Sequence, residues 1–400
     1  MLSRRDTFTA TIRVATLSAT ALALVSCADL PDAPSTIGTP SASAPSSSAA
    51  AERRGDESAG QAGAVYTLTN AAGGNGVIAF HRAADGSLTP LGTFATGGNG
   101  AGGTLDPLAS QFAVVVNESH DALFAVDAGS DDIASFRVGS DGALAPASRV
   151  SSGGTRPVSI AVHGNLVYAL NTGDNTVSGF RVGGGAQLVA LPRSTRALPS
   201  GANGAAAIRF TPDGGQLVVA ERVSNRLEVF AVLPDGRLGE PVVTPGNGGA
   251  SFGFDITSHN QAIVSETQGS LTSYAIAANG TLTTVTPSIS TGGNAPCWVT
   301  ITADGRFAYT TNSASATLAG YAVDAAGHLT PLTPGTPTGE SGTGAVPIDF
   351  DHVGNRFLFT LEAGTGTIGT FAINADGTLA AHADVAAGAP ASGMQGLAAF

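Results

Sequence analysis

Residues 206–245 read AAIRFTPDGGQLVVAERVSNRLEVFAVLPDGRLGEPVVTP, and this stretch decides the fold. It contains four short, mainly apolar runs separated by turn residues. The third run, NRLEVFAV, alternates at period two, which is the pattern of a half-buried strand. It is followed by Asp235-Gly236, a pair that tolerates positive φ and closes tight hairpins. The stretch therefore predicts a sheet of four strands joined by short turns.

The same unit occurs seven times along the chain. Each copy has an aromatic residue inside its alternating run, and these residues follow one another at intervals of 44 to 56 residues. They are Phe80, Phe136, Phe180, Phe230, Tyr274, Tyr321 and Phe371. A repeat of this length that contains only strands and turns is typical of propeller blades and not of a helical solenoid. A β-sandwich is the alternative fold, but it does not require seven units.

The two ends of the repeat complement each other. The first copy lacks a leading strand, since it opens at residues 64–70 with AVYTLTN, and residues 397–400, LAAF, resemble the missing strand. Pairing the two would close a ring and leave no free sheet edge. We therefore predict an all-β fold, a seven-bladed β-propeller over residues 64–400, in which the C-terminal strand pairs with the N-terminal blade.

The N-terminal segment has the pattern of an export signal. Residues 1–27 combine three arginines with an apolar stretch at residues 14–26 that is too short to span a bilayer. The segment ends in LVSC, which resembles the bacterial lipobox, so Cys27 is the predicted lipidation site. An ordinary secretory signal with an incidental cysteine is the alternative. Residues 28–63 are rich in Ser, Pro, Ala and Gly and predict a flexible tether. We expect an exported protein, held at the periplasmic or extracellular face of the bacterial cell envelope by a lipid anchor only.

Composition removes several classes of function. All 18 basic residues are Arg, which excludes a Lys nucleophile or a Lys Schiff base. The net charge of −12, with no basic stripe, argues against nucleic acid as a partner. The seven His are scattered and form no metal-ligand pair. We expect a monomer with no cofactor and no dedicated metal site, and Ca²⁺ is the ion that a group of Asn, Asp and Glu side chains would hold.

A polar residue ends the second strand of every repeat, eight to ten residues before the strand aromatic. The seven are Asn70, Asp127, Asn171, Glu221, Glu266, Asn312 and Glu362. Because the second strand of each blade ends on the face where the next blade begins, we expect these side chains to form a ligand-binding ring around one mouth of the central channel. Asn and Asp at a strand end often only start a turn, which is the alternative interpretation. Glu is a poor turn former, so the three Glu positions are the more suggestive.

Two arginines are candidates for binding an anion on the same face. Arg156 lies in one of the Gly-rich loops that connect successive blades, and Arg222 directly follows Glu221. Glycine in these loops would let backbone approach a ligand closely. The alternative is that each arginine is a surface residue paired with one of the many carboxylates.

Residues 218–238, VVAERVSNRLEVFAVLPDGRL, and residues 295–321, APCWVTITADGRFAYTTNSASATLAGY, are similar to lactonase-type seven-bladed propellers. That family includes 6-phosphogluconolactonase-like proteins and carboxymuconate-lactonizing enzymes. The resemblance covers the whole of residues 64–400. It implies the propeller fold, and it makes lactone hydrolysis the expected activity.

The resemblance also implies which residues act. In the enzymes of the family, the fourth repeat has an Arg-His pair in its first strand and a Glu at the end of its second. Glu221 matches that Glu, and the pair reads Ala206-Ala207 here. A lactone hydrolase would use Glu221 to position or deprotonate water, and Arg222 or Arg156 to stabilise the developing oxyanion. Without the pair, the alternative is a non-catalytic envelope lipoprotein whose channel mouth binds a ligand or a protein partner.

Overall fold

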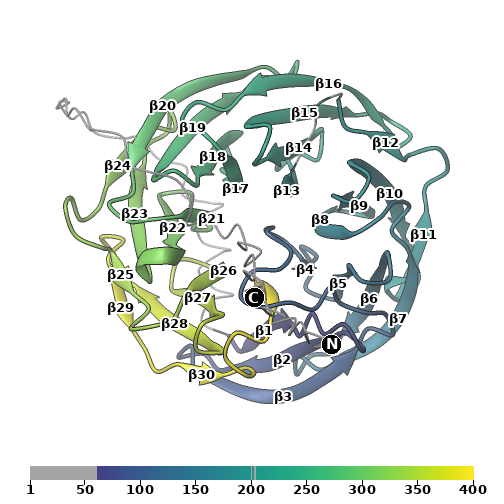
Figure 1. Ribbon diagram of the computed structural model, residues 1–400, viewed down its shortest axis with the longest axis horizontal. Coiled ribbons are helices and arrows are strands. Elements are labelled where there is room, and N and C mark those ends of the chain that lie inside the picture. The colour runs from purple at the N-terminus through teal and green to yellow at the C-terminus, as the bar shows by residue number, and fades with distance from the viewer. Residues whose placement is uncertain (1–60, 200, 202–203) are drawn as a thin grey trace, which may run out of the picture.

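The described part of the chain forms a ring of seven sheets around a central axis (Figure 1). The computed structural model describes residues 61–199, 201 and 204–400. The predictions made for residues 1–60, including the signal segment, the lipidation of Cys27 and most of the tether, lie outside this part of the chain.

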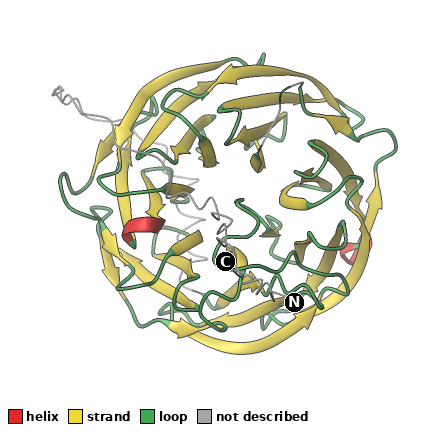
Figure 2. Ribbon diagram, in the orientation of Figure 1, coloured by secondary structure: helices red, strands yellow, loops and turns green. Residues whose placement is uncertain are grey.

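The described residues are almost all strands, turns and loops (Figure 2). The exceptions are two short 3-10 turns, η1 (Gly184–Ala186) and η2 (Ser313–Ser315). Within the described ranges, no helix has the length and apolar character needed to cross a membrane.

Each sheet is one blade, with one strand at the axis and the last strand at the rim. From the inner strand outward, the strands are, in blade 1, β31 (Gln395–Ala399), β1 (Gly63–Leu68), β2 (Gly76–Arg82) and β3 (Leu88–Ala95); in blade 2, β4 (Val114–Val116), β5 (Ala122–Asp127), β6 (Asp132–Val138) and β7 (Leu144–Ser151); in blade 3, β8 (Pro157–His163), β9 (Leu166–Asn171), β10 (Thr176–Val182), β11 (Leu188–Ala190) and β12 (Arg196–Ala197); in blade 4, β13 (Ala205–Phe210), β14 (Gln216–Glu221), β15 (Arg226–Val232) and β16 (Leu238–Pro245); in blade 5, β17 (Ser251–Ile256), β18 (Gln261–Glu266), β19 (Ser270–Ile276) and β20 (Leu282–Ser290); in blade 6, β21 (Pro296–Ile301), β22 (Phe307–Asn312), β23 (Thr317–Val323), β24 (Leu329–Pro331) and β25 (Gly339–Glu340); and in blade 7, β26 (Pro347–Val353), β27 (Phe357–Glu362), β28 (Thr367–Ile373), β29 (Leu379–Ala381) and β30 (Val385–Ala386). In blades 3, 6 and 7 the outer strand is broken into two pieces that both pair with the third strand. The predicted seven-bladed β-propeller is confirmed.

The ends of the propeller close the ring as the sequence predicts. Strand β31 pairs antiparallel with β1, and it begins at Gln395, two residues before the strand that the sequence indicates. The pairing extends past the strands, because the backbone of Ala64 and the backbone of Phe400 exchange two hydrogen bonds of 3.1 and 3.0 Å. Arg82 Nε donates a further hydrogen bond of 2.9 Å to the Phe400 carbonyl oxygen.

The hairpins between the third and fourth strands have the predicted turn chemistry. The second turn residue is Gly in all seven blades, and its φ lies between 68° and 90°. This is the left-handed region, which a residue with a Cβ enters at a cost. The Gly residues therefore set the length and register of the outer hairpins.

Buried tyrosine hydroxyls join three pairs of neighbouring blades. In each pair, a tyrosine on a second strand donates to the glycine carbonyl oxygen in the next blade's outer hairpin, at 2.8 Å. The pairs are Tyr66 and Gly142, Tyr168 and Gly236, and Tyr309 and Gly377. Since these hydroxyls are buried, their loss would leave a carbonyl without a donor.

We expect Tyr309→Phe to lower the free energy of unfolding by about 1–3 kcal/mol, because the buried Gly377 carbonyl would lose its partner. Urea unfolding followed by circular dichroism would measure the change. Val223→Ala, at an exposed side chain, is the control and should leave the midpoint unchanged. An unchanged midpoint for Tyr309→Phe would show that the hydrogen bond contributes nothing to stability.

Candidate functional site

The structure does not place the seven polar residues around an open mouth. All seven are at most 1% exposed. They lie where the second strand of a blade ends, and each makes at least one hydrogen bond to a nearby strand or loop. Asp127 accepts hydrogen bonds from Asn75 Nδ2 at 2.9 Å and Thr96 Oγ1 at 2.6 Å, and Glu266 accepts one from the Gly248 amide at 2.7 Å. The binding roles predicted for Asn70, Asp127, Asn171, Glu266, Asn312 and Glu362 remain predictions, but their side chains are held inside the protein.

The Gly-rich loops pack directly on these polar side chains. A Cβ at Gly98, Gly154, Gly248 or Gly293 would lie too close to Asp127, Asn171, Glu266 or Asn312, respectively. Glycine is therefore required at these four positions for packing within the protein. The expectation that these glycines let backbone approach a ligand gains no support from their positions.

Glu221 is fully buried in a cluster with a second glutamate and an arginine. Its carboxylate accepts hydrogen bonds from Arg226 Nε, at 2.8 Å, and from the Ser224 hydroxyl. Arg226 Nε also lies 3.1 Å from Oε1 of Glu228, which is fully buried as well. Two carboxyl groups thus share one guanidinium. Burial, and then the neighbouring Glu221, raise the pKa of Glu228 to about 8.

This cluster makes stability depend on pH. The pKa of Glu228 is about 8 in the folded protein and about 4.5 for an ordinary glutamate, so the folded state holds a proton that the unfolded state loses between these values. We expect the free energy of unfolding to fall as the pH rises from about 4.5 to about 8, by at most about 1.4 kcal/mol per pH unit from this group.

Glu228→Gln removes the titrating group and should flatten this dependence. Urea midpoints at pH 5 and pH 8 would show it, with Glu240→Gln as the control because the Glu240 side chain is 85% exposed. Burial also raises the pKa of Glu362, to about 7, so the variant should keep part of the slope. Equal slopes for the wild type and Glu228→Gln would contradict the assignment.

A segment that belongs to none of the repeats crosses the central channel. We call residues 105–113 the plug; they precede β4, which lies near the centre of Figure 1. The plug is bonded to the inner strands of three other blades. These hydrogen bonds run from Gln111 N to Ala206 O (3.0 Å), from Ser159 Oγ to Gln111 O (2.6 Å), from Gln111 Nε2 to Val299 O (2.7 Å), from Ser110 Oγ to Val158 O (2.8 Å) and from Trp298 Nε1 to Ser110 O (2.8 Å).

Small residues on the inner strands make room for the plug. A Cβ at Gly253 would overlap Gln111 Oε1, and Phe112 packs against the hydrophobic cluster that contains Ala207. Ala206 is fully buried, and its carbonyl oxygen accepts the Gln111 amide. The positions where the resemblance expects an Arg-His pair are therefore covered by the plug and have no side chain that could act on a substrate.

One end of the plug brings together both predicted arginines. Exposed Arg156 donates from Nη2 to the Pro107 carbonyl oxygen at 2.8 Å. Arg222 acts electrostatically on the adjacent Asp106, and its Nε is buried with no hydrogen-bond partner in the described part of the chain. Both arginines thus lie at Asp106-Pro107, and not at Glu221.

Asp106 is a carboxyl group that the sequence alone did not single out. Its Oδ1 accepts the Ala109 amide at 3.0 Å, and its carboxyl group is also bonded to the Gln395 side chain. Gln395 Oε1 in turn accepts the Leu108 amide at 3.1 Å, so it holds the loop in place. Burial raises the pKa of Asp106 to about 6, against the hydrogen bonds and the Arg222 charge, which lower it.

A second unexpected carboxyl group lies in the inner strand of blade 7. Asp349 occupies a bulge of β26 with φ of 53°, is 1% exposed and has no hydrogen-bond partner on Oδ2 within the described residues. Burial is the main cause that raises its pKa far above the usual range, and the charges of Asp351 and Asp106 raise it further. The corresponding bulges in blades 3 and 4 contain Val158 and Ala206. That contrast is the signal in the sequence that could have identified Asp349.

Residues 113–289 and 257–394 match the protein family described as lactonase, 7-bladed beta-propeller. The chain belongs to this family. Among curated proteins, this lactonase-family chain is 27% identical over 208 residues to 6-phosphogluconolactonases of Yersinia pestis and Yersinia pseudotuberculosis. The match covers 49% of the chain and 62% of those relatives, so the chain spans less than two thirds of their length.

Solved structures show the same fold. A protein from Lactobacillus plantarum has a TM-score of 0.69 at 20% identity, over 85% of this chain and 99% of its own. A putative 6-phosphogluconolactonase from Bacteroides uniformis has a TM-score of 0.68 at 19% identity, and a periplasmic gluconolactonase from Pseudomonas aeruginosa has 0.66 at 19%; each match covers 84% of this chain and 99% of that protein. At these identities the likeness is one of fold.

Among the described residues of this lactonase-family chain, no group of three or more His, Cys, Asp and Glu side chains is arranged to hold a metal ion. The expectations of a cofactor-free protein and of low Ca²⁺ affinity remain predictions. The chemistry that the channel mouth offers is that of one carboxyl group with a pKa near neutrality and two guanidinium groups.

Proposed function

We propose that this lactonase-family protein hydrolyses a lactone at the plug end where Asp106, Arg222 and Arg156 meet. The observation that carries the proposal is the pairing of Asp106, whose pKa is about 6, with a guanidinium that has an unused buried donor. A general base works best when its pKa lies near the working pH. The match to the lactonase family and the similarity to proteins named 6-phosphogluconolactonase support the reaction class.

In the proposed reaction, Asp106 accepts a proton from a water molecule as the water oxygen attacks the lactone carbonyl carbon. Negative charge then develops on the carbonyl oxygen, and Arg222, with Arg156 at the rim, stabilises it. The ring C–O bond breaks as the tetrahedral intermediate collapses, and the proton passes from Asp106 to the leaving alkoxide. The product is the open hydroxy acid, and Asp106 returns to its starting form.

This assignment replaces Glu221 by Asp106 as the group that activates water. Glu221 is fully buried and its carboxylate is occupied by Arg226 and Ser224, whereas Asp106 is only partly buried. Gln395 acts as a positioning residue, because it binds both the Asp106 carboxyl group and the Leu108 amide.

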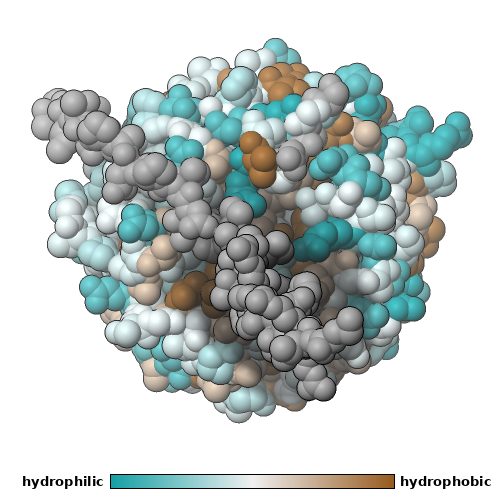
Figure 3. All heavy atoms as spheres, in the orientation of Figure 1, coloured by the Kyte–Doolittle hydropathy of each residue, from teal (hydrophilic) through white to brown (hydrophobic). Residues whose placement is uncertain are grey.

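A specific observation favours the second candidate function, a non-catalytic protein that binds a ligand or a protein partner. The plug fills the channel, and Ala206-Ala207 supply no catalytic side chain. On the face shown in Figure 3, hydrophobic side chains are scattered among hydrophilic ones, so a partner bound to this face would meet a mixed surface. In either case, the N-terminal sequence supports export as a monomer and anchoring to the cell envelope through Cys27.

We expect Asp106→Asn to lower kcat for lactone hydrolysis by roughly 10²- to 10⁴-fold, because the general base is lost. Glu221→Gln should retain most of the activity if it folds. Acid release by the full chain from gluconolactone, 6-phosphogluconolactone and simple γ- and δ-lactones, with and without EDTA and Ca²⁺, would measure this. Activity lost in Glu221→Gln but kept in Asp106→Asn would return the role to Glu221. No turnover by folded wild-type protein would favour the binding protein.

The pH dependence gives a separate test of Asp106. Its base form is the active one and its pKa is about 6. We therefore expect kcat/KM to rise up to tenfold per pH unit below about pH 6 and to level off above it. Initial rates between pH 4.5 and 8, corrected for spontaneous hydrolysis, would show the profile. A flat profile in this range would exclude Asp106 as the base.

A further inference from the structure

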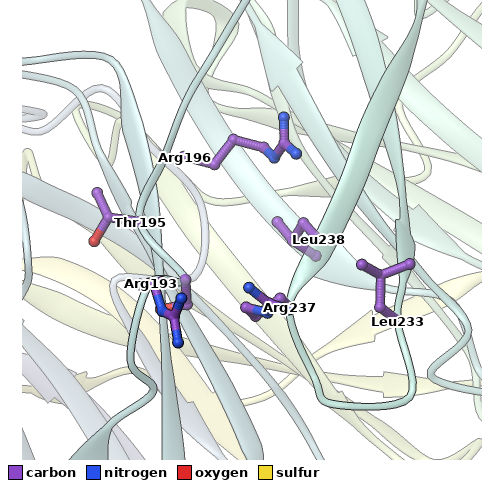
Figure 4. Close-up of a pocket in the computed structure, with 7 residues that line it drawn as sticks. Arg193, Thr195, Arg196, Leu233, Arg237 and Leu238 are labelled. Carbon is purple, nitrogen blue, oxygen red and sulfur yellow. The ribbon is translucent and has the colours of Figure 1, made fainter.

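A basic groove lies between blades 3 and 4, at the outer rim of the propeller. Its volume is about 350 Å³, and Figure 4 shows its lining side chains. Blade 3 contributes the break in its outer strand and blade 4 contributes its outer hairpin. The lining residues are Arg193, Ser194, Thr195, Arg196, Leu233, Arg237 and Leu238.

The groove concentrates positive charge on an acidic protein. The chain has a net charge of −12, yet three of the 13 arginines at residues 61–400 line this groove and Arg181 lies beside it. Arg196 pairs with Glu240 at 2.8 Å, and Arg237 pairs with Asp235 at 2.6 Å. The guanidinium of Arg193 has no hydrogen bond or ion pair within the described ranges, so positive charge is in excess here.

The walls of the groove are held in place. The Tyr168 hydroxyl bonds the Gly236 carbonyl oxygen at 2.8 Å, and Arg181 Nη2 bonds the Asp235 carbonyl oxygen at 2.8 Å. These bonds join the blade 4 hairpin to blade 3. On the other wall, Ser194 Oγ bonds the backbone of Gly179. The arginines therefore extend from two fixed backbones, which reduces the entropy lost on binding.

The fold does not require these arginines. The junction of blades 6 and 7 has the same tyrosine bond, from Tyr309 to Gly377, and the same break in the outer strand. At that break, residues 332–338 read LTPGTPT, whereas residues 191–197 of blade 3 read LPRSTRA. The two segments begin alike, since Leu191 and Leu332 donate to the equivalent carbonyl oxygens of the third strands. The charged segment is thus specific to one of two otherwise similar junctions.

We propose that this groove binds a small molecule that carries two or more closely spaced anionic groups, phosphate or carboxylate. Guanidinium groups recognise both through paired N–H···O hydrogen bonds. Leu233, 40% exposed, and Leu238 provide an apolar wall for the body of the ligand. The groove lies at the rim, apart from Asp106 and the channel, so this site is independent of the proposed lactone hydrolysis.

The test is isothermal titration of the full chain at low ionic strength with inorganic pyrophosphate and, separately, with citrate. We expect saturable binding to one site, weakened by added salt. Arg193→Ala and Arg237→Ala should each weaken binding about tenfold, as loss of a charged hydrogen-bond donor does. Binding of pyrophosphate alone would identify a phosphate ligand, and binding of citrate alone a polycarboxylate.

The matched control is Arg306→Ala. Arg306 is an exposed arginine that pairs with Asp304, two residues earlier, at 2.6 Å, just as Arg237 pairs with Asp235, but it is not part of the groove. Its loss should leave binding unchanged. No binding of either anion, or equal loss in Arg306→Ala and Arg193→Ala, would overturn the proposal. If Arg237→Ala does not fold, exposed Arg193 decides alone, since no contact of its guanidinium is lost.

Discussion

The pairing of β31 with β1 is the interaction on which the rest of the structure depends. A propeller of seven sheets has no covalent link between its first and last blades, so one blade must be built from both ends of the chain. Here the inner strand of blade 1 is supplied from residues 395–399, and Thr67 Oγ1 bonds Gln395 O across a separation of 328 residues. The tyrosine bonds between neighbouring blades, the filled channel and the groove at the rim all need the ring to be closed.

Once the ring is closed, the plug decides where chemistry can take place. It occupies the centre, and the small residues Ala206, Ala207 and Gly253 let it lie against the inner strands. The polar groups that remain partly accessible are then those at one end of the plug. In other words, the residues that remove the family's usual pair also create the loop that carries Asp106. A change in one inner strand and the insertion of one loop are two sides of the same structural change.

The fold could be predicted from sequence because it is repeated seven times, and errors in one copy are corrected by the others. The candidate site could be predicted only in part. Arg156 and Arg222 were identified from their positions in the repeat, and both do lie at one loop. Asp106 lies in a segment with no counterpart in other blades, so repetition gives no information about it. For Glu221, the alternation of a strand indicates a buried face, but not that Arg226 and Ser224 would occupy the carboxylate.

The late position of β31 has a consequence for how the protein is made. Six blades can form as the chain leaves the ribosome, but blade 1 gains its inner strand only after residue 399 has been synthesised. Contacts of such long sequence separation form slowly, because a large loop must close before any contact is gained. Until then β1 and the neighbouring inner strands are exposed. Full-length synthesis is therefore a condition for a closed, aggregation-resistant propeller, and premature termination would leave an open edge.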